Sequence, residues 1–166
     1  MDVVALGELL IDFTENGVSG QGNPLFEANP GGAPCNVLAM LSRLGHRTAF
    51  IGKVGNDFFG KQLEDAITEV GIDAAGLLKD DKVHTTLALG HTYPDGDRDF
   101  SFYRNPGADM MLMEEELPEE IIRGAKIFHF GTLSMTHPGV RAATKKAIAV
   151  AKEAGALISF DPNIRK

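Results

Sequence analysis

The sequence predicts an α/β fold built on a mostly parallel β-sheet. Three observations predict it. Short apolar runs alternate with amphipathic segments of helical periodicity, which is typical of parallel strands buried on both faces. The amphipathic segments end at glycines, as helices commonly do. From residue 126 onward a strand, a helix and a second strand follow within about 35 residues, the length of a βαβ unit.

The chain begins with a buried strand. Residues 3–6 are all apolar, and Gly7 closes the run. Apolar residues then alternate with smaller or polar ones as far as residue 13. Residues 14–24 are rich in Gly, Asn and Ser, and this composition predicts a loop.

Two helices and a second buried strand follow. The periodicity predicts a helix over 34–44, a strand over 48–51 and another helix after Asp57. Asp57 is a suitable N-cap because its short side chain can accept a hydrogen bond from the first turn. Gly45 and Gly71 are expected to end the two helices.

The segment 83–103 has a different pattern. Side chains alternate on both sides of the turn residues 94–96, which predicts an antiparallel hairpin. A hairpin inside an alternating α/β pattern is expected outside the main sheet, as a lid or an edge. After it we expect a strand over 126–130, a helix beginning at Pro138 and a strand over 156–160.

The composition excludes several classes of partner. The 166 residues suit one domain, and the net charge is −7 with lysines and arginines scattered among acids. Nucleic acid and anionic membranes are therefore not expected partners. Cys35 is the one cysteine, so no internal disulfide can form, which fits a reducing compartment. With no signal peptide and no apolar run of about 20 residues, we expect a cytoplasmic protein.

Polar residues gather where strands end and helices begin. Gly31 and Gly32 lead into a predicted helix and would let a ligand approach the backbone. Asn36 falls in the first turn, where its amide can donate to and accept from a hydroxyl. Asp12 follows the first strand region, and ligands of open α/β sheets bind at the carboxyl ends of strands. The alternatives are a helix-start signal for the glycines and a solvated loop acid for Asp12.

Two further clusters follow strands. Arg104 comes just after the hairpin and offers a rigid fork to a hydroxyl, carboxylate or phosphate, although a surface salt bridge explains it equally well. Asp161, Asn163 and Arg165 follow the last strand and place an acid, an amide and a guanidinium at the ligand-facing edge. Residues 55–62 fit a phosphate-binding loop only in part, because Gln62 stands where Ser or Thr is needed, and we reject it. The histidines lack metal-ligand spacing, so no metal site is predicted.

These pieces together resemble a known family. Residues 31–36, the helix through Gly45 and the run 55–60 resemble the amino-terminal signature of the ribokinase-like (phosphofructokinase-B) sugar kinases. The runs FYRNPGADM (102–110) and SFDPNIR (159–165) resemble the fructokinase branch in particular. The resemblance covers essentially every residue of the chain.

The resemblance implies a doubly wound α/β domain with a small β-sheet lid, formed by residues near 14–30 and 83–103. It also implies phosphorylation of a sugar hydroxyl, here of fructose, with ATP and Mg²⁺. Lids of two subunits often pair in this family, so a homodimer is expected. By position the resemblance places eight residues at the sugar: Asp12, Gly31, Gly32, Asn36, Phe102, Arg104, Asn163 and Arg165. Phe102 and Arg104 are expected on the lid side, and Asn163 and Arg165 between the sugar and the phosphates.

The family's carboxyl-terminal signature, a Gly-Ala-Gly-Asp type sequence, is absent from the 166 residues. In the family its aspartate is the base, and the nucleotide pocket and the acids that organise magnesium lie mostly in that later part. We therefore expect an amino-terminal, sugar-binding half with no catalytic residue, and no measurable kinase turnover from residues 1–166 alone. The alternatives are a 2-keto-3-deoxygluconate kinase, a non-catalytic sugar-binding module, or a truncated chain that is unstable or rescued by oligomerisation.

Overall fold

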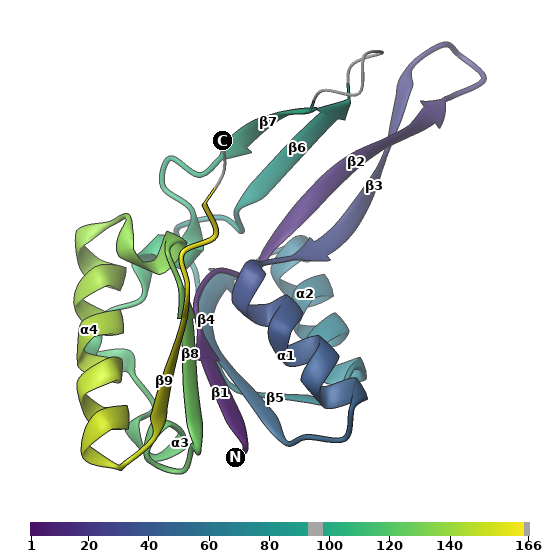
Figure 1. The fold of residues 1–166 in the computed structure, drawn as a ribbon. Coiled ribbons are helices and arrows are strands. Elements are labelled where there is room, and N and C mark those ends of the chain that lie inside the picture. The colour runs from purple at the N-terminus through teal and green to yellow at the C-terminus, as the bar shows by residue number, and fades with distance from the viewer. Residues whose placement is uncertain (93–97, 165–166) are drawn as a thin grey trace.

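The computed structural model describes residues 1–92 and 98–164, and this part of the chain forms two β-sheets (Figure 1). The larger sheet has five parallel strands in the order β5-β4-β1-β8-β9, which confirms the predicted fold class. Its strands are β1 (Val3–Leu6), β4 (Thr48–Gly55), β5 (Ile72–Asp80), β8 (Ile127–Gly131) and β9 (Leu157–Asp161). The smaller sheet has the order β3-β2-β6-β7. Its strands are β2 (Leu10–Val18), β3 (Pro24–Gly31), β6 (Leu87–Thr92) and β7 (Arg98–Tyr103).

Helices cover both faces of the larger sheet. Figure 1 shows α1 (Ala33–Arg43) and α2 (Phe58–Glu69) on one face and α4 (Pro138–Glu153) on the other. All residues of β1 are buried, and they alternate between the two sides: Val4 and Leu6 belong to the core under α4, whereas Val3 and Ala5 belong to the core under α1 and α2. This double burial explains why β1 reads as a continuous apolar run.

The predicted helix ends agree with the structure. Pro34 lies in the first turn of α1, and Gly45, with φ of +86°, follows its last turn. The N–H of His46 donates to the carbonyl of Leu41, 3.1 Å away, so the turn is closed by a backbone hydrogen bond that needs the left-handed residue. Gly71 and Gly155 have the same conformation after α2 and α4.

The smaller sheet projects beyond the carboxyl ends of β1, β8 and β9 (Figure 1). Strand β2 pairs with β3 in antiparallel and with β6 in parallel orientation, and β6 pairs with β7 in antiparallel orientation. The hairpin predicted over 83–103 is confirmed for its two strands, whereas its predicted turn, residues 94–96, lies outside the described residues.

Two parts of the sequence-based prediction were wrong or incomplete. Residues 14–24 are not one loop, because β2 continues to Val18 and β3 begins at Pro24. Most residues of this stretch are exposed, so they lack the apolar alternation that reveals a half-buried strand. Strand β5 and the short helices in the stretch 108–123 were not predicted at all, including α3 (Glu119–Arg123).

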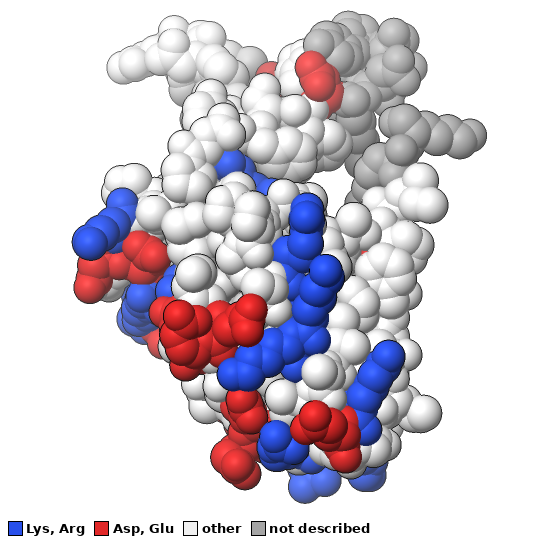
Figure 2. All heavy atoms as spheres, turned by 90° about the vertical axis from the view of Figure 1, so that its left-hand side faces the viewer, with Lys and Arg blue, Asp and Glu red and all other residues white. Residues whose placement is uncertain are grey.

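The face that carries α4 is mixed in charge. Figure 2 shows basic and acidic side chains interspersed over this face rather than gathered by sign. Lys146 and Arg123 pair with Glu119 at 2.9 and 3.3 Å, and Arg123 also lies 3.8 Å from Glu153. This face therefore offers no continuous basic patch to a polyanion. Among the described helices, none is both long and apolar enough to cross a membrane.

Asp57 joins the start of α2 to the chain that enters the smaller sheet. Its Oδ1 accepts from the Gly60 N–H at 2.8 Å and from the Thr85 hydroxyl at 2.7 Å, and its Oδ2 accepts from the Thr85 N–H at 2.9 Å. Burial alone raises the pKa of Asp57, but these hydrogen bonds outweigh it and leave the pKa below its ordinary value. The predicted N-cap thus also holds Thr85, in the chain that leads into β6.

Replacing Asp57 by Ala should lower the free energy of unfolding by about 2–3 kcal/mol at pH 7, the sum of a lost helix cap and lost bonds to Thr85. Urea unfolding measures this, with Asp65→Ala, an exposed position of α2, as the matched control. Because the folded pKa lies below the unfolded value of about 3.9, the stabilisation is present above that pH and is lost as the pH falls through the folded pKa. Equal losses in the two variants would contradict this role of Asp57.

Candidate functional site

The candidate site lies where the two sheets meet. The parallel strands β1, β8 and β9 end at the same edge of the larger sheet, and the smaller sheet begins there (Figure 1). Four segments reach this edge: the connection from β1 to β2, the passage from β3 into α1, the chain after β7 and the chain after β9. The predicted site residues that the structure describes belong to these segments or to the strands beside them.

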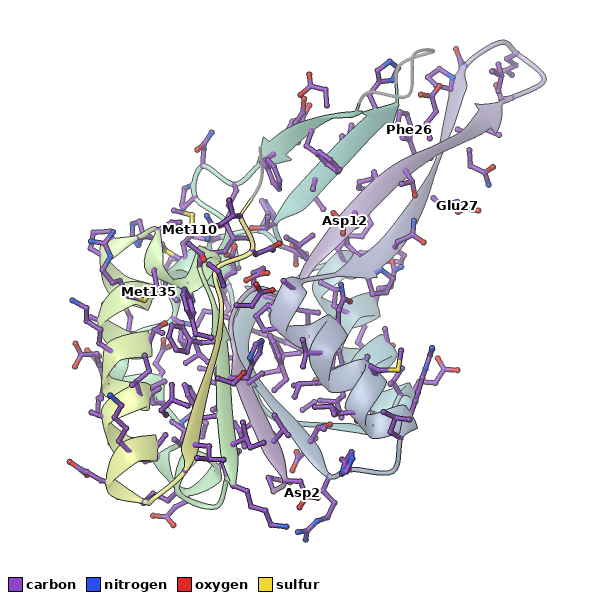
Figure 3. All side chains as sticks on the ribbon, viewed as in Figure 1. Asp2, Asp12, Phe26, Glu27, Met110 and Met135 are labelled. Carbon is purple, nitrogen blue, oxygen red and sulfur yellow. The ribbon has the colours of Figure 1, made fainter. Side chains whose placement is uncertain are left out.

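Asp12 and Gly31 are in direct contact. Asp12 lies on β2, paired with Asn29 of β3 and Ala88 of β6, and Figure 3 shows it near the base of the smaller sheet. A side-chain carbon added to Gly31 would lie 2.1 Å from Asp12 Oδ2, so the glycine makes room for the carboxylate. Burial raises the pKa of Asp12. Within the described residues no donor is hydrogen bonded to this carboxylate, so its oxygens can accept from a ligand.

Phe102 shares a face of the smaller sheet with Asp12. Ala88 pairs with Asp12 on one side and with Phe102 on the other, and residues paired across strands point to the same face. Phe100 stacks against Phe102 with ring centroids 6.3 Å apart, and both rings are exposed. The face therefore combines a carboxylate with flat apolar surface, a combination that suits a sugar ring with its hydroxyls.

Gly32 and Asn36 form the start of α1. Gly32 has a φ of +132°, and a side-chain carbon there would lie 2.3 Å from the backbone oxygen of Glu8. Only glycine fits this position without strain, because both the backbone conformation and the space exclude a side chain. The Gly32 carbonyl accepts from the Asn36 N–H at 2.9 Å. The Asn36 side chain is exposed and makes no hydrogen bond within the described residues.

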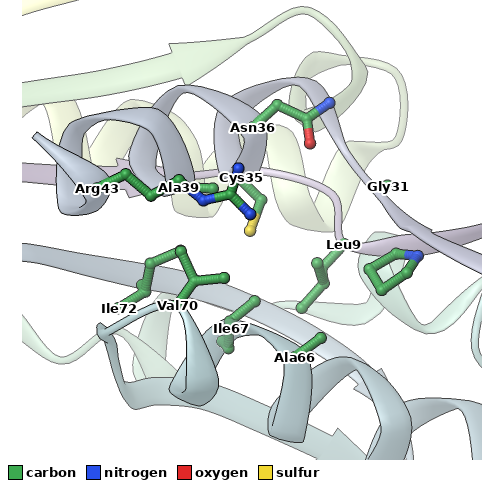
Figure 4. Close-up of a pocket in the computed structure, with 11 residues that line it drawn as sticks. Leu9, Gly31, Cys35, Asn36, Ala39, Arg43, Ala66, Ile67, Val70 and Ile72 are labelled. Carbon is green, nitrogen blue, oxygen red and sulfur yellow. The ribbon is translucent and has the colours of Figure 1, made fainter.

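A hollow of about 230 Å³ lies between α1 and α2, and its wall includes Gly31 and Asn36 (Figure 4). The rest of the wall is mainly apolar and consists of Leu9, Pro30, Cys35, Ala39, Arg43, Ala66, Ile67, Val70 and Ile72. Burial raises the pKa of the Cys35 thiol to about 12, so the thiol stays protonated, as expected for an inert buried cysteine. An apolar wall gives sugar hydroxyls few partners, and we do not assign the sugar to this hollow.

Arg104 forms a buried ion pair with Asp109. Its Nε and Nη2 lie 2.8 and 2.7 Å from Asp109 Oδ2, and the two side chains are 12% and 3% exposed. Nη1 donates to the Thr136 hydroxyl at 3.1 Å and Nη2 to the Leu133 carbonyl at 3.3 Å, while the Thr86 hydroxyl donates to Asp109 Oδ1 at 2.5 Å. The guanidinium thus ties β7 to the segment after β8. Within the described residues, three of its five N–H groups donate hydrogen bonds, and Nη2 also faces Asp109 in the ion pair.

The predicted residues do not share one hollow. Phe102 and Arg104 line a second hollow of about 750 Å³, whereas Gly31 and Asn36 line the first and Asp12 lines neither. The other residues of the second hollow are Asp57, Phe58, Phe59, His84, Thr85, Leu87, Tyr103, Asn105 and Pro106. That the acid, the amide and the guanidinium contact a single hexose therefore stays a prediction.

The chain after β9 stays at the carboxyl edge. Asn163 has a φ of +45°, and its N–H donates to Asp161 Oδ1 at 2.8 Å. The Thr132 hydroxyl, after β8, donates to the Pro162 carbonyl at 2.6 Å. Asn163 thus lies at the predicted edge of the sheet, whereas the predicted site residue Arg165 lies outside the described residues.

Two acids of this region were missed in the sequence analysis. Glu8 is only 3% exposed, and its Oε1 accepts from the Ala33 N–H at 2.8 Å. Asp109 belongs to the FYRNPGADM run but was given no role. The available signal for Glu8 was a single charge between the apolar residues 3–6 and 9–11, and the signal for Asp109 was an acid five residues after an arginine. Among the described residues, no group of three or more His, Cys, Asp or Glu could hold a metal ion, so we assign no metal ligand.

Comparison with known proteins gives consistent matches along the whole chain. Residues 1–166 match the family described as pfkB family carbohydrate kinase. The chain is 49% identical over 166 residues to probable fructokinase-3 of Arabidopsis thaliana, covering 99% of this chain and 48% of that protein.

Two solved structures show the same pattern of coverage. The fructokinase of Xylella fastidiosa with bound ATP is 35% identical with a TM-score of 0.92, and the match covers 99% of this chain and 52% of that one. The putative ribokinase II of E. coli in complex with ATP and Mg²⁺ is 31% identical with a TM-score of 0.89, covering 99% and 53%. The chain therefore spans about half the length of the relatives it matches.

The close contact at Gly32 gives a stability test. Gly32→Ala should lower the free energy of unfolding by about 1–3 kcal/mol more than Gly71→Ala, because both positions have positive φ but only Gly32 adds a clash, with the Glu8 oxygen. Gly71 has no atom within 4 Å of the added carbon and therefore isolates the cost of the backbone conformation. Urea unfolding of the two variants measures the difference, and equal costs would show that the contact relaxes freely.

Proposed function

This chain belongs to the pfkB family of carbohydrate kinases, and we propose that it forms the sugar-binding half of an ATP-dependent fructokinase that makes fructose 6-phosphate. The fold is ribokinase-like, and relatives that share about half their length with the chain are fructokinases. The observation that carries the proposal is the Asp12 carboxylate, which lies against Gly31 with free acceptor capacity at the edge where the two sheets meet. A cytoplasmic location is part of the same proposal.

In the proposed complex, the residues of this chain bind and orient the sugar. Asp12 accepts hydrogen bonds from two neighbouring hydroxyls, and the amide of Asn36 donates to and accepts from another. Gly31 and Gly32 let the sugar approach the backbone, and Phe102 covers it from the smaller sheet. A sugar held in this way reacts faster, because the entropy cost of orienting it is met on binding and no longer adds to the barrier of the chemical step.

Arg104 acts mainly through its position in this proposal. Its hydrogen bonds to Thr136 and Leu133 hold the end of β7 near the segment after β8, and we place it at the lid side of the sugar. Asn163 and Arg165 are proposed to line the region between sugar and phosphates. Together with the smaller sheet these groups would exclude water from the reacting hydroxyl.

ATP and Mg²⁺ are proposed cofactors, held mainly by the part of the relatives that lies beyond the matched half. Bound Mg²⁺ neutralises charge on the phosphates during phosphoryl transfer. The base that takes the hydroxyl proton is likewise expected outside these 166 residues, in the Gly-Ala-Gly-Asp type signature. Residues 1–166 supply sugar recognition and not the proton transfer.

Simple measurements distinguish the proposed fructokinase from two alternative functions. A 2-keto-3-deoxygluconate kinase would share the arginine after an aromatic strand, and a substrate panel on the full-length protein distinguishes the two sugars. The run Arg104–Met110 favours fructose. A non-catalytic sugar-binding module would bind fructose in calorimetry without turnover at full length, whereas a mere fragment with half its sheet exposed would bind poorly.

At its full encoded length, the protein should phosphorylate fructose with ATP, and Asp12→Ala should raise the KM for fructose about 100-fold. The loss corresponds to about 3 kcal/mol for two hydrogen bonds to a carboxylate. A coupled ADP-release assay measures it, with Asp65→Ala of α2 as the control that should leave KM unchanged. Burial raises the pKa of Asp12 above its ordinary value of about 3.9. Fructose affinity should therefore weaken as the pH falls through this raised pKa, because the carboxylate becomes protonated. Unchanged KM in Asp12→Ala would reject the site.

A homodimer formed through the smaller sheet is also proposed. Val18, Leu25 and Phe26 are large apolar residues that are exposed on β2 and β3, and Figure 3 shows Phe26 toward the far end of this sheet. Burial of such residues against a second copy would stabilise a pair by about 25 cal/mol per Å² of apolar surface, before the cost of association.

Phe26→Asp should shift the protein toward monomer in sedimentation velocity, because the charge would be buried in the proposed interface. Phe58→Asp is the matched control, since Phe58 is an exposed phenylalanine on α2 rather than on the smaller sheet. A wild-type protein that sediments as a monomer at micromolar concentration, or equal effects of both substitutions, would contradict pairing through this sheet.

A further inference from the structure

Glu8 is a buried acid that the proposed sugar contacts do not use. It lies in the connection between β1 and β2 and is 3% exposed. Its Oε1 accepts from the N–H of Ala33, the first residue of α1, at 2.8 Å. Its Oε2 is also buried and has no hydrogen-bond partner within the described structure. A carboxyl group in this state needs a structural or functional reason, because burying it costs free energy.

Glu8 contacts the glycine-led start of α1 through two different groups. The carboxyl group accepts from Ala33, and the backbone oxygen occupies the space where a side chain of Gly32 would lie, 2.3 Å from the added carbon. The first turn of α1 leaves N–H groups without intrahelical acceptors, and Gly32 supplies no side-chain cap. Glu8 therefore provides, from a distant part of the fold, the acceptor that a capping residue normally provides.

The charges of Arg104 and Asp109 act on the titration of Glu8. Burial raises the pKa of Glu8, the negative charge of Asp109 adds to this rise, and the positive charge of Arg104 opposes it. Glu8 in turn contributes to the raised pKa of the Cys35 thiol of α1. Because Arg104 is already paired with Asp109, a second ionised acid in this region would lack a counter-charge.

We propose that Glu8 is a positioning residue for the sugar site, which fixes the start of α1, and with it Gly32 and Asn36, relative to the β1–β2 connection. The proposal rests on the proposed sugar site. Asn36 lies one turn after the Ala33 N–H that Glu8 holds, so a shift of this turn moves the amide directly. Small displacements of orienting groups have large effects on rate and affinity.

The test compares Glu8→Gln, Glu8→Ala and Val150→Ala in the protein at its full encoded length. Glutamine keeps an oxygen acceptor for the Ala33 N–H, and alanine removes it. Val150 is a buried residue of α4, on the opposite face of the larger sheet, and Val150→Ala controls for a general loss of stability. Steady-state kinetics gives the KM for fructose and the KM for ATP separately.

Glu8→Ala should raise the KM for fructose about tenfold or more, the effect of about one hydrogen bond, and leave the KM for ATP unchanged. Glu8→Gln should stay within about twofold of wild type for both, as should Val150→Ala. An unchanged KM for fructose in Glu8→Ala, an equal rise in both KM values, or a Glu8→Gln variant as impaired as Glu8→Ala would overturn the proposal.

A second measurement keeps this result separate from the proposed function. In the sugar-free protein, Glu8→Ala should shift the amide resonances of Ala33 and Asn36 in a ¹H–¹⁵N spectrum, and Glu8→Gln should preserve them. If the wild-type protein fails to phosphorylate fructose, the proposed function fails, and this spectrum still decides whether Glu8 holds the helix start. Unchanged resonances in Glu8→Ala would overturn the positioning role.

Discussion

The contact between the β1–β2 connection and the start of α1 is the constraint on which the rest of the site depends. At position 32, with a φ of +132°, glycine is the one residue type that fits against the Glu8 backbone oxygen. Gly31 leaves space for the Asp12 carboxylate. Two adjacent glycines thus allow two backbone segments and one carboxylate to meet at the end of β1. Asn36 follows one turn later, so its position is a consequence of this packing.

Two groups of hydrogen bonds connect the smaller sheet to the larger one. The Arg104–Asp109 pair reaches the segment after β8, and Asp57 ties the chain entering β6 to the start of α2. The charged side chains in both groups make several hydrogen bonds each, and such bonds offset the cost of removing a charge from water. The smaller sheet is therefore attached at its base, while its far end carries exposed apolar residues such as Phe26.

The sequence was informative where burial imposes a pattern. Residues 3–6 are apolar because β1 is buried on both faces, and Asp57 has the short acceptor side chain that a helix N-cap favours. The exposed residues 14–18 gave no such pattern, since their strand is stabilised by its neighbours rather than by a core. Side-chain partners were the least predictable: the isolated charge of Glu8 and the acid five residues after Arg104 are visible in the sequence, but they do not identify Ala33 or the Arg104–Asp109 pairing.

The central claim is that Asp12 and Asn36 bind one hexose beneath Phe102. A crystal structure of the full-length protein with fructose tests it most directly. The account predicts sugar hydroxyls within hydrogen-bond distance of the Asp12 carboxylate and the Asn36 amide, with the ring against the face that carries Phe102. Fructose bound instead in the hollow lined by Phe58 and Tyr103, with no contact to Asp12, would contradict it.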